Sequence, residues 1–216
     1  MRSKSEVMTK TNLTVAALVL GVSFMFGLFL FQHWHSNDTQ EVSFATVLEP
    51  AREVSAFNLQ GVDGRPFTQK DLQGKWTWLF FGFTSCPELC PTTMAKLAKS
   101  YQLLKQGKKV DLPQVVMVSL DPKHDSLARL KYYVEAFHPN FYGATSTASV
   151  VKSLASEMGI AYAKIKLPQG QSTNAYTIEH SGAIMVVNPK GELQAFFNPP
   201  FSAENLAHDY RVLARK

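Results

Sequence analysis

A run of apolar residues followed directly by a pair of cysteines constrains the fold of this chain more than any other part of its sequence. Residues 76–83 (WTWLFFGF) are almost continuously apolar, which is typical of a strand buried on both faces of a sheet. Cys86–Pro91 follows, and helical spacing then relates Met94, Leu97, Ala98, Tyr101 and Leu104. Because Val115–Leu120 reads as a second buried strand, the pattern predicts a βαβ unit.

The rest of the chain predicts further helices and strands of an α/β sandwich. We expect a short hairpin over 54–67 with a turn at Gly61–Gly64, helices over 127–137, 150–158 and 203–213, and a second hairpin with strands over 183–187 and 193–197. The sheet should therefore have a parallel part, built from βαβ units, and an antiparallel edge.

Composition limits the classes of function that need to be considered. The chain has 216 residues, of which 45% are hydrophobic and 18% charged, and this leaves room for one packed domain and an appendage. Its net charge is +5, but the lysines and arginines are scattered, with no run of five or more. This distribution speaks against nucleic-acid binding.

The N-terminal segment predicts attachment to a membrane. Leu13–Phe31 contains 19 residues without a charge, which is about the length that a membrane-spanning helix needs. Arg2, Lys4 and Lys10 precede it, so the positive-inside rule places residues 1–12 in the cytoplasm. A cleaved signal peptide is the alternative, but the apolar stretch is longer than a usual signal core and no small-residue cleavage site directly follows it.

This topology divides the chain into an anchor, a tether and a domain. We expect a transmembrane anchor over 13–31, a polar tether over 32–50 and the folded domain over 51–216. A bacterial inner membrane with the domain in the periplasm fits better than a mitochondrial inner membrane, because no Arg-rich amphipathic presequence precedes the apolar stretch.

The only two cysteines, Cys86 and Cys90, lie between the first buried strand and the helix that follows. Pro91 suits the first turn of a helix, so the helix should begin near Cys90. A helix N-terminus favours thiolate over thiol, and thiolate is both the nucleophile and the metal ligand. A purely structural disulfide between Cys86 and Cys90 is the alternative, but a disulfide that closes so short a loop contributes comparatively little stability. The motif alone does not choose between reversible oxidation and metal binding.

A third ligand would distinguish a metal site from a simple dithiol. Two thiolates suit Cu(I), and an imidazole would complete a three-coordinate site. The chain has six histidines. His180 lies just before the strand expected over 183–187 and ends a long polar loop, but a lone histidine is more often structural or solvated than a ligand.

Three blocks of sequence together resemble a known family. They are Phe81–Pro91 (FGFTSCPELCP), Ser119–Asp125 (SLDPKHD), and Ile178–Ser181 (IEHS) with Asn188–Gly191 (NPKG). In this order and spacing the chain resembles the Sco/SenC family of copper-binding proteins associated with cytochrome c oxidase assembly. The likeness covers nearly the whole domain, from about Val54 to Leu213.

The resemblance implies a fold, a ligand set and a partner. It implies a thioredoxin-like, peroxiredoxin-type sandwich in which Cys86, Cys90 and His180 bind copper as Cu(I), or also as Cu(II). Asp121 and Asp125 would lie near the site, although Asp121 also suits a turn or a helix cap. The implied function is a copper metallochaperone that delivers copper to, or matures, the binuclear copper site of cytochrome c oxidase.

The same family resemblance leaves a second function open. A thiol-disulfide oxidoreductase would reduce the cysteines of that oxidase site or of another extracytoplasmic partner. Cys86 would then attack the partner's disulfide and Cys90 would resolve the mixed disulfide. A peroxidase has little support in this sequence beyond Thr84 near Cys86.

Overall fold

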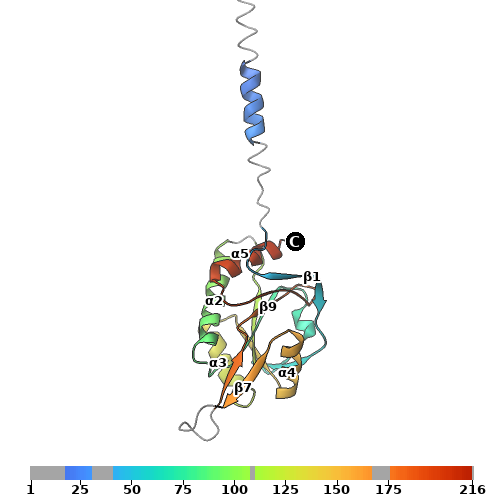
Figure 1. The fold of residues 1–216 in the computed structure, drawn as a ribbon, viewed down its shortest axis with the longest axis vertical. Coiled ribbons are helices and arrows are strands. Elements are labelled where there is room, and N and C mark those ends of the chain that lie inside the picture. Colours follow the sequence, from blue (N-terminus) through green and yellow to red (C-terminus); the bar gives the residue numbers. More distant parts are fainter. Residues whose placement is uncertain (1–17, 31–40, 108–109, 167–175, 216) are drawn as a thin grey trace, which may run out of the picture. The chain divides into compact units, whose positions relative to one another are not determined.

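The structure is a computed structural model that describes residues 18–30, 41–107, 110–166 and 176–215 (Figure 1). It divides into two compact units, Met1–Gln40 and Glu41–Lys216. The second unit contains both cysteines and His180.

A mixed sheet forms the centre of this unit. Among the described residues it has eight strands in the order β1-β10-β9-β4-β5-β6-β2-β3. Their bounds are β1 Thr46–Glu53, β2 Asn58–Gly61, β3 Pro66–Thr68, β4 Thr77–Gly82, β5 Gln114–Ser119, β6 Tyr142–Thr145, β9 Ile184–Val187 and β10 Glu192–Phe197. β4, β5 and β6 are parallel, whereas β9 pairs antiparallel with β4 and with β10. The predicted parallel part and antiparallel edge are therefore confirmed.

Helices cover both faces of the sheet. Figure 1 shows α2 (Leu89–Gly107) and α3 (Leu127–Phe137) on one side and α4 (Ala148–Glu157) on the other, and α5 (Ala203–Leu213) packs against α2. A short 3-10 helix spans Gln69–Leu72. Three of the helices begin at a hydroxyl side chain that accepts a backbone N–H, as expected of a helix cap: Ser126, Thr147 and Ser202.

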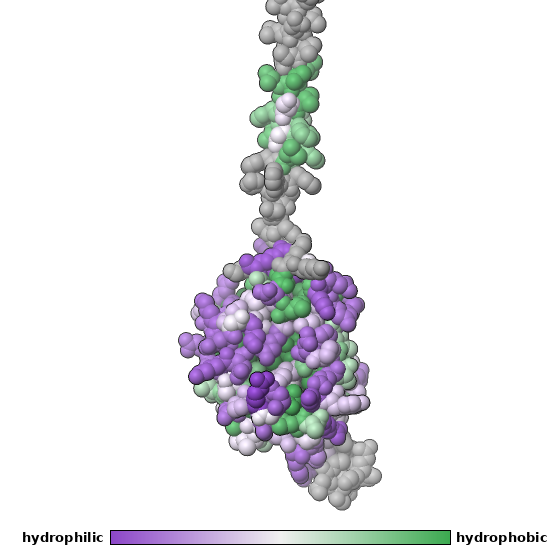
Figure 2. Space-filling view, turned by 180° about the vertical axis from the view of Figure 1, so that it is seen from behind, coloured by the Kyte–Doolittle hydropathy of each residue, from purple (hydrophilic) through white to green (hydrophobic). Residues whose placement is uncertain are grey.

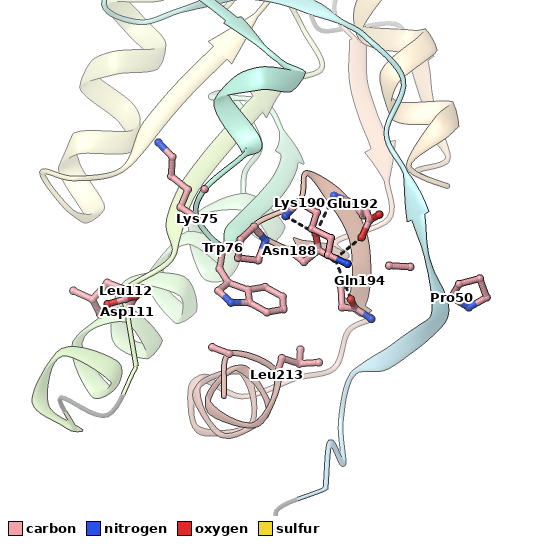
Figure 3. A pocket seen from close by; sticks show the side chains of 14 residues that line it. Pro50, Lys75, Trp76, Asp111, Leu112, Asn188, Lys190, Glu192, Gln194 and Leu213 are labelled. Atoms are coloured by element: carbon pink, nitrogen blue, oxygen red, sulfur yellow. Dashed lines mark hydrogen bonds between the residues drawn. The ribbon is translucent and has the colours of Figure 1, made fainter. Parts of the chain in front are cut away.

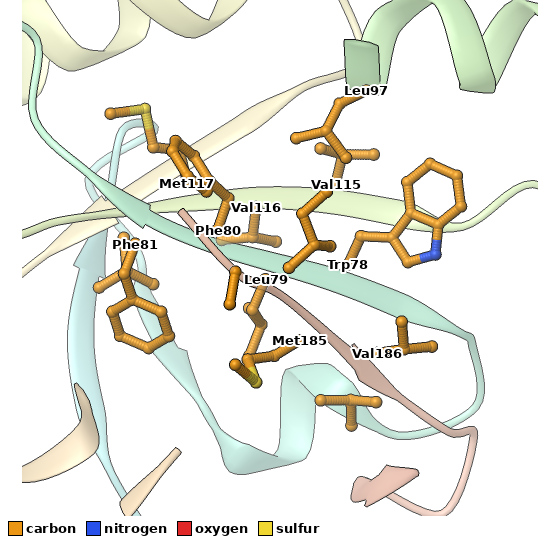
Figure 4. Close-up of a cluster of buried hydrophobic side chains, with 14 of the residues drawn as sticks. Trp78, Leu79, Phe80, Phe81, Leu97, Val115, Val116, Met117, Met185 and Val186 are labelled. Carbon is orange, nitrogen blue, oxygen red and sulfur yellow. The ribbon is translucent and has the colours of Figure 1, made fainter. Parts of the chain in front are cut away.

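The apolar run over residues 76–83 forms β4, and every residue of this strand is buried. Figure 4 shows Trp78 and Phe80 of β4 among side chains of β5, β9 and α2. Trp78 packs edge-on against Tyr210 of α5, with ring centroids 5.2 Å apart. β4 lies centrally in the sheet and is covered on both faces, so the loop that follows it emerges at the C-terminal end of the parallel strands.

The folded unit begins before Ala51, the expected boundary. β1 starts at Thr46 and pairs with β10, so the second part of the expected tether belongs to the domain. The carboxylate of Asp209, fully buried on α5, accepts the backbone N–H groups of Ser43, Phe44 and Ala45 at 2.7 to 3.1 Å. The sequence of this segment lacks a periodic apolar pattern, which is why its structure was not predicted.

A second sheet was not predicted either. β7 (Tyr162–Lys166) and β8 (Tyr176–His180) pair antiparallel as a two-stranded sheet, separate from the main one. The polar loop predicted to end at His180 contains β8, a strand in which only Ile178 is buried, so no apolar pattern marks it. His180 is the last residue of β8, so this hairpin carries the histidine.

In the first unit, the structure describes a helix over residues 18–30. Its apolar side chains are exposed on all sides, and Figure 2 shows hydrophobic residues along its whole described length. Within the described ranges, no helix is both long enough and apolar enough to cross a membrane. The remaining residues of the expected anchor, 13–17 and 31, and the expected cytoplasmic segment 1–12 lie outside the described residues.

Candidate metal centre

The two cysteines lie on the turn that connects β4 to α2. The N–H of Cys86 donates to the carbonyl of Phe83 at 3.3 Å and closes this turn. α2 begins at Leu89, within one residue of the prediction, so Cys90 belongs to its first turn. The N–H of Cys90 donates to Sγ of Cys86 at 3.3 Å. The sulfur of Cys86 therefore satisfies one of the backbone donors that a helix N-terminus leaves unpaired.

His180 completes a group of three ligand atoms. Its Nε2 lies 3.4 Å from Sγ of Cys90, and the ligand atoms of Cys86, Cys90 and His180 all lie within 4.8 Å of one another. Its Nδ1 lies 3.1 Å from the carbonyl oxygen of Ser181. Because a carbonyl only accepts, we assign the proton to Nδ1, which leaves the lone pair of Nε2 directed at the cysteines.

Burial changes the pKa of two of these three groups, Cys90 and His180, and in each case it favours the neutral form. Burial raises the pKa of the Cys90 thiol, and a hydrogen bond with the backbone of Phe83 offsets only part of this rise. Burial also lowers the pKa of His180, against a smaller opposing effect of the Ser181 carbonyl. A neutral imidazole is the form that binds metals. The ring centroids of Phe80 and Phe83 each lie 6.0 Å from that of the imidazole, so both rings contribute to its partial burial.

Two glycines allow the parts of the site to approach one another. A Cβ on Gly82, the last residue of β4, would lie 2.9 Å from Sγ of Cys90 and 2.8 Å from a ring carbon of Phe80. A Cβ on Gly182 would lie 2.9 Å from Leu89, at the start of α2. Side chains at these positions would push the cysteine turn away from the sheet and from the histidine segment.

Asp125 supports the turn that carries the cysteines. It is 1% exposed, and its carboxylate accepts the N–H and the hydroxyl of Thr84 and the hydroxyl of Ser119. Arg129 of α3 donates to the hydroxyls of Thr84 and Ser85 at 2.6 and 3.0 Å. These contacts fix the two residues that precede Cys86, so Asp125 supports the ligand segment without touching a ligand.

Asp121 contacts the hairpin that carries His180 and not the cysteines. Its carboxylate accepts the hydroxyl of Tyr176 at 2.6 Å and the ammonium of Lys164 at 3.2 Å, and it pairs with Nδ1 of His124 at 2.9 Å. Burial raises the pKa of Asp121, but these hydrogen bonds outweigh that effect and hold the pKa below its ordinary value. Its N–H donates to Ser119.

The supporting residues beyond the aspartates were not identified from sequence. Hydrogen bonds between distant segments position Thr84, Arg129, Lys164 and Tyr176. Such bonds leave no periodic pattern in a sequence. Thr84 and Ser119 did carry a signal, because they lie at or near the ends of buried strands and within the blocks Phe81–Pro91 and Ser119–Asp125 that resemble the family.

The other described histidines lie in other surroundings. His124 pairs with Asp121, His138 packs 4.6 Å from the ring of Tyr101, and His208 pairs with Asp209. His33 and His35 lie outside the described residues. Among the histidines that the structure describes, His180 is the one grouped with the two cysteines.

A pocket of about 640 Å³ opens onto the cysteine turn and His180, lined also by Phe83, Pro87, Glu88, Leu89, Thr92, Thr177, Ile178 and Glu179. A larger cavity of about 960 Å³ surrounds Trp76, which precedes β4, so it lies at the opposite end of that strand. Figure 3 shows the side chains that line this cavity, where the amide of Asn188 donates hydrogen bonds to Glu192 and Gln194. No cysteine or histidine is among the described residues that line this cavity. Of these two pockets, the smaller one is the one lined by Cys86 and His180.

Comparisons with known proteins place the chain in a family. A family model described as SCO1/SenC matches residues 45–215. Protein SCO1 homolog 1, mitochondrial, of Arabidopsis thaliana is 31% identical over 176 residues, which are 80% of this chain and 51% of that protein. The chain therefore spans about half the length of this relative.

Two solved structures of Sco proteins have folds similar to that of this chain. Arabidopsis thaliana ScoI with copper bound matches with a TM-score of 0.69 and 30% identity, over 75% of this chain and 98% of that one. Yeast Sco1 with copper bound matches with a TM-score of 0.66 and 26% identity, over 74% of this chain and 86% of that one. These matches confirm the predicted α/β, thioredoxin-like fold. Since the matched family model extends over nearly the whole folded unit and includes both cysteines and His180, the chain belongs to the SCO1/SenC family.

Proposed function

We propose that this protein is a copper metallochaperone whose cargo is held by Cys86, Cys90 and His180. The observation that carries the proposal is the convergence of two sulfur atoms and one imidazole nitrogen within 4.8 Å. Two thiolates and a neutral imidazole form a donor set that suits Cu(I). The fit agrees with the copper-bound structures of the Arabidopsis and yeast relatives.

The residues have distinct tasks in this proposal. Cys86 and Cys90 lose their protons when they bind the cargo, so both must be reduced. His180 offers Nε2 while its Nδ1 stays bonded to Ser181. Asp125 holds the cysteine turn, and the pocket beside Cys86 gives the thiols of a partner access to the site. As partner we propose the copper-site subunit of cytochrome c oxidase, or another protein with copper-binding thiols.

Copper titration tests the ligand set. The reduced chain should bind one Cu(I) in anaerobic competition with a chelator, and His180→Ala should weaken binding at least about tenfold, or 1.4 kcal/mol, because one donor is lost. His138→Ala is the matched control, since His138 is also partly buried but packs against Tyr101. Equal affinities of all three proteins would exclude His180 as a ligand.

A second function, thiol-disulfide reduction, is favoured by the close approach of the cysteines and the accessibility of Cys86. The Cys86 thiolate would attack a partner's disulfide and release one partner thiolate; Cys90 would then displace the other, so the partner ends reduced and the pair Cys86–Cys90 oxidised. In Cys90→Ser the reaction should stop at the mixed disulfide, detected as a covalent adduct on a non-reducing gel. If no adduct forms with the copper-site subunit as the substrate, this result would contradict the activity.

We further propose that residues 13–31 anchor the chain in a bacterial inner membrane, with residues 1–12 in the cytoplasm and the domain in the periplasm. The support is the described helix over 18–30, whose exposed apolar side chains suit a lipid environment. The full chain should remain in the membrane fraction after alkaline extraction, and a chain that begins at Glu41 should be released. Release of both chains would contradict the anchor.

A further inference from the structure

The hairpin that carries His180 needs a separate explanation, because it is not hydrogen-bonded into the main sheet. β7 and β8 pair only with each other among the described strands. Next to His180, the backbone N–H of Ser181 donates a hydrogen bond to the carbonyl of Ala161, the residue that precedes β7. This bond therefore joins the two ends of the hairpin to each other and not to the main sheet. The position of His180 relative to the cysteines therefore depends on how the hairpin packs against the domain.

One face of the hairpin packs against the domain. Side chains alternate along a strand, so Tyr176, Ile178 and His180 share one face of β8. Ile178 is 4% exposed, and Lys164 lies opposite it in the register of β7 and β8. The face that directs His180 at Cys90 thus also directs Tyr176 and Lys164 at the domain.

These two side chains meet a charged group there. The Tyr176 hydroxyl and the Lys164 ammonium both bind the same carboxylate oxygen of Asp121, at 2.6 and 3.2 Å. The ammonium also lies 3.2 Å from the Tyr176 hydroxyl and 4.6 Å from the centre of its ring. Asp121 is 4% exposed and the Lys164 side chain 41%, so these charge-assisted bonds join a buried carboxylate to a partner that water reaches.

The same contacts connect the two halves of the site. Ser119, fully buried at the end of β5, accepts the N–H of Asp121 and donates to Asp125. Asp125 in turn binds Thr84, two residues before Cys86. The cysteine turn and the hairpin are therefore both held against one residue of the rigid central sheet.

We propose that Tyr176, Lys164 and Asp121 form a clasp that holds His180 beside the two cysteines, and that Tyr176 is a positioning residue for copper binding. This inference rests on the proposed function. Without the Tyr176 hydroxyl, the hairpin leaves its docked position more often, and the cargo then keeps only its two sulfur ligands. Tyr176 does not touch the cargo and acts only through His180.

A double-mutant cycle on the reduced full chain tests this. Tyr176→Phe should weaken Cu(I) affinity about three- to tenfold, because the hydroxyl loses its hydrogen bonds with Asp121, Lys164 and His124 and water compensates part of the loss. In the His180→Ala background, Tyr176→Phe should leave the affinity unchanged within twofold. Tyr132→Phe is the matched control, because Tyr132 is 80% exposed on α3. Lys164→Met gives an independent test of the clasp if Tyr176→Phe does not fold.

Hydrogen exchange of the copper-free chain provides a readout independent of copper. Tyr176→Phe should speed exchange in residues 176–180 while α2 keeps its protection. An equal loss of affinity in both backgrounds, or unchanged affinity together with unchanged exchange, would overturn the clasp. If the unmodified chain binds no Cu(I), the proposed function fails, and the exchange result alone decides whether Tyr176 holds the hairpin.

Discussion

Gly82 shows how little space surrounds the buried ligand. In Gly82→Ala the new methyl group would lie 2.9 Å from Sγ of Cys90 and 3.2 Å from Met117. We expect the free energy of unfolding to fall by about 1–3 kcal/mol, the usual cost of overpacking a core, and Cu(I) affinity to fall with it. Urea unfolding and chelator competition measure the two effects.

Gly107→Ala is the matched control for this substitution. The nearest atom to a Cβ there belongs to the flexible side chain of Arg211, at 3.4 Å. Its unfolding free energy should change by no more than about 0.5 kcal/mol. Equal effects of the two substitutions would mean that the space around Cys90 is not limiting.

The buried imidazole of His180 predicts a pH dependence of stability. Burial lowers its pKa below the ordinary value of 6.5, so the unfolded chain binds this proton at a higher pH than the folded chain does. Between the two pKa values the unfolded state binds more protons, and stability therefore rises with pH. Stability should be lost as the pH falls below about 6.5.

The measurement is urea unfolding of the reduced, copper-free chain across this pH range, compared with His180→Asn. Groups that both proteins share, including His138, whose pKa burial also lowers, cancel in the difference. The variant should lose less stability than the unmodified chain as the pH falls. Parallel curves would show that His180 titrates alike in the folded and unfolded states.

At the scale of secondary-structure elements, the loop after β5 supports the turn after β4. Asp125→Asn replaces an acceptor-only carboxylate by an amide that has one acceptor oxygen for the N–H and hydroxyl of Thr84 and the hydroxyl of Ser119. We expect the unfolding free energy to fall by about 1–3 kcal/mol. Copper affinity should also decrease, because Thr84 leads into Cys86.

Asp111→Asn, at an exposed aspartate, is the control for this change. Chemical unfolding and Cu(I) competition on both variants separate the loss of a buried acceptor from the loss of one negative charge. The supporting role of Asp125 would be refuted by two variants that behave alike.

The elements that could be predicted are those whose burial follows a simple period. β4, β5 and α2 are buried along a whole strand or a whole helix stripe, and the sequence pattern identified all three. The strand β6 was missed although three of its four residues are buried, because so short a segment shows no period. The strands β1, β7 and β8 were missed because most of their side chains are exposed or half-buried. Their positions depend on partners such as Asp209 and Asp121, which are distant in sequence.

Some residues of the candidate site could likewise be predicted from the sequence and others could not. Cys86 and Cys90 were identified from their position between a buried strand and a helix. The assignment of His180 required the family resemblance, because spacing did not distinguish it from the other histidines. Tyr176 and Lys164 could not be found, since nothing local distinguishes a tyrosine or lysine that binds Asp121 from one that faces solvent.

At the scale of the whole molecule, the folded unit should function without residues 1–40. A chain that begins at Glu41 keeps the Ser43–Ala45 amides that bind Asp209. Its urea midpoint and its Cu(I) affinity should match those of the full chain, the latter within twofold. Asp209→Asn, by contrast, should lower the unfolding free energy by about 1–3 kcal/mol, because a buried acceptor of several N–H groups is lost. A large loss on truncation would mean that the first unit stabilises the second.

The unequal accessibility of the two sulfurs has a kinetic consequence for the proposed copper transfer. Cys86 faces the pocket, whereas Cys90 is fully buried beneath it. An acceptor thiol therefore displaces Cys86 first, in a step whose rate rises with acceptor concentration. Cys90 is the last sulfur to dissociate, so the final step is unimolecular and sets an upper limit on the rate of delivery, however abundant the acceptor is.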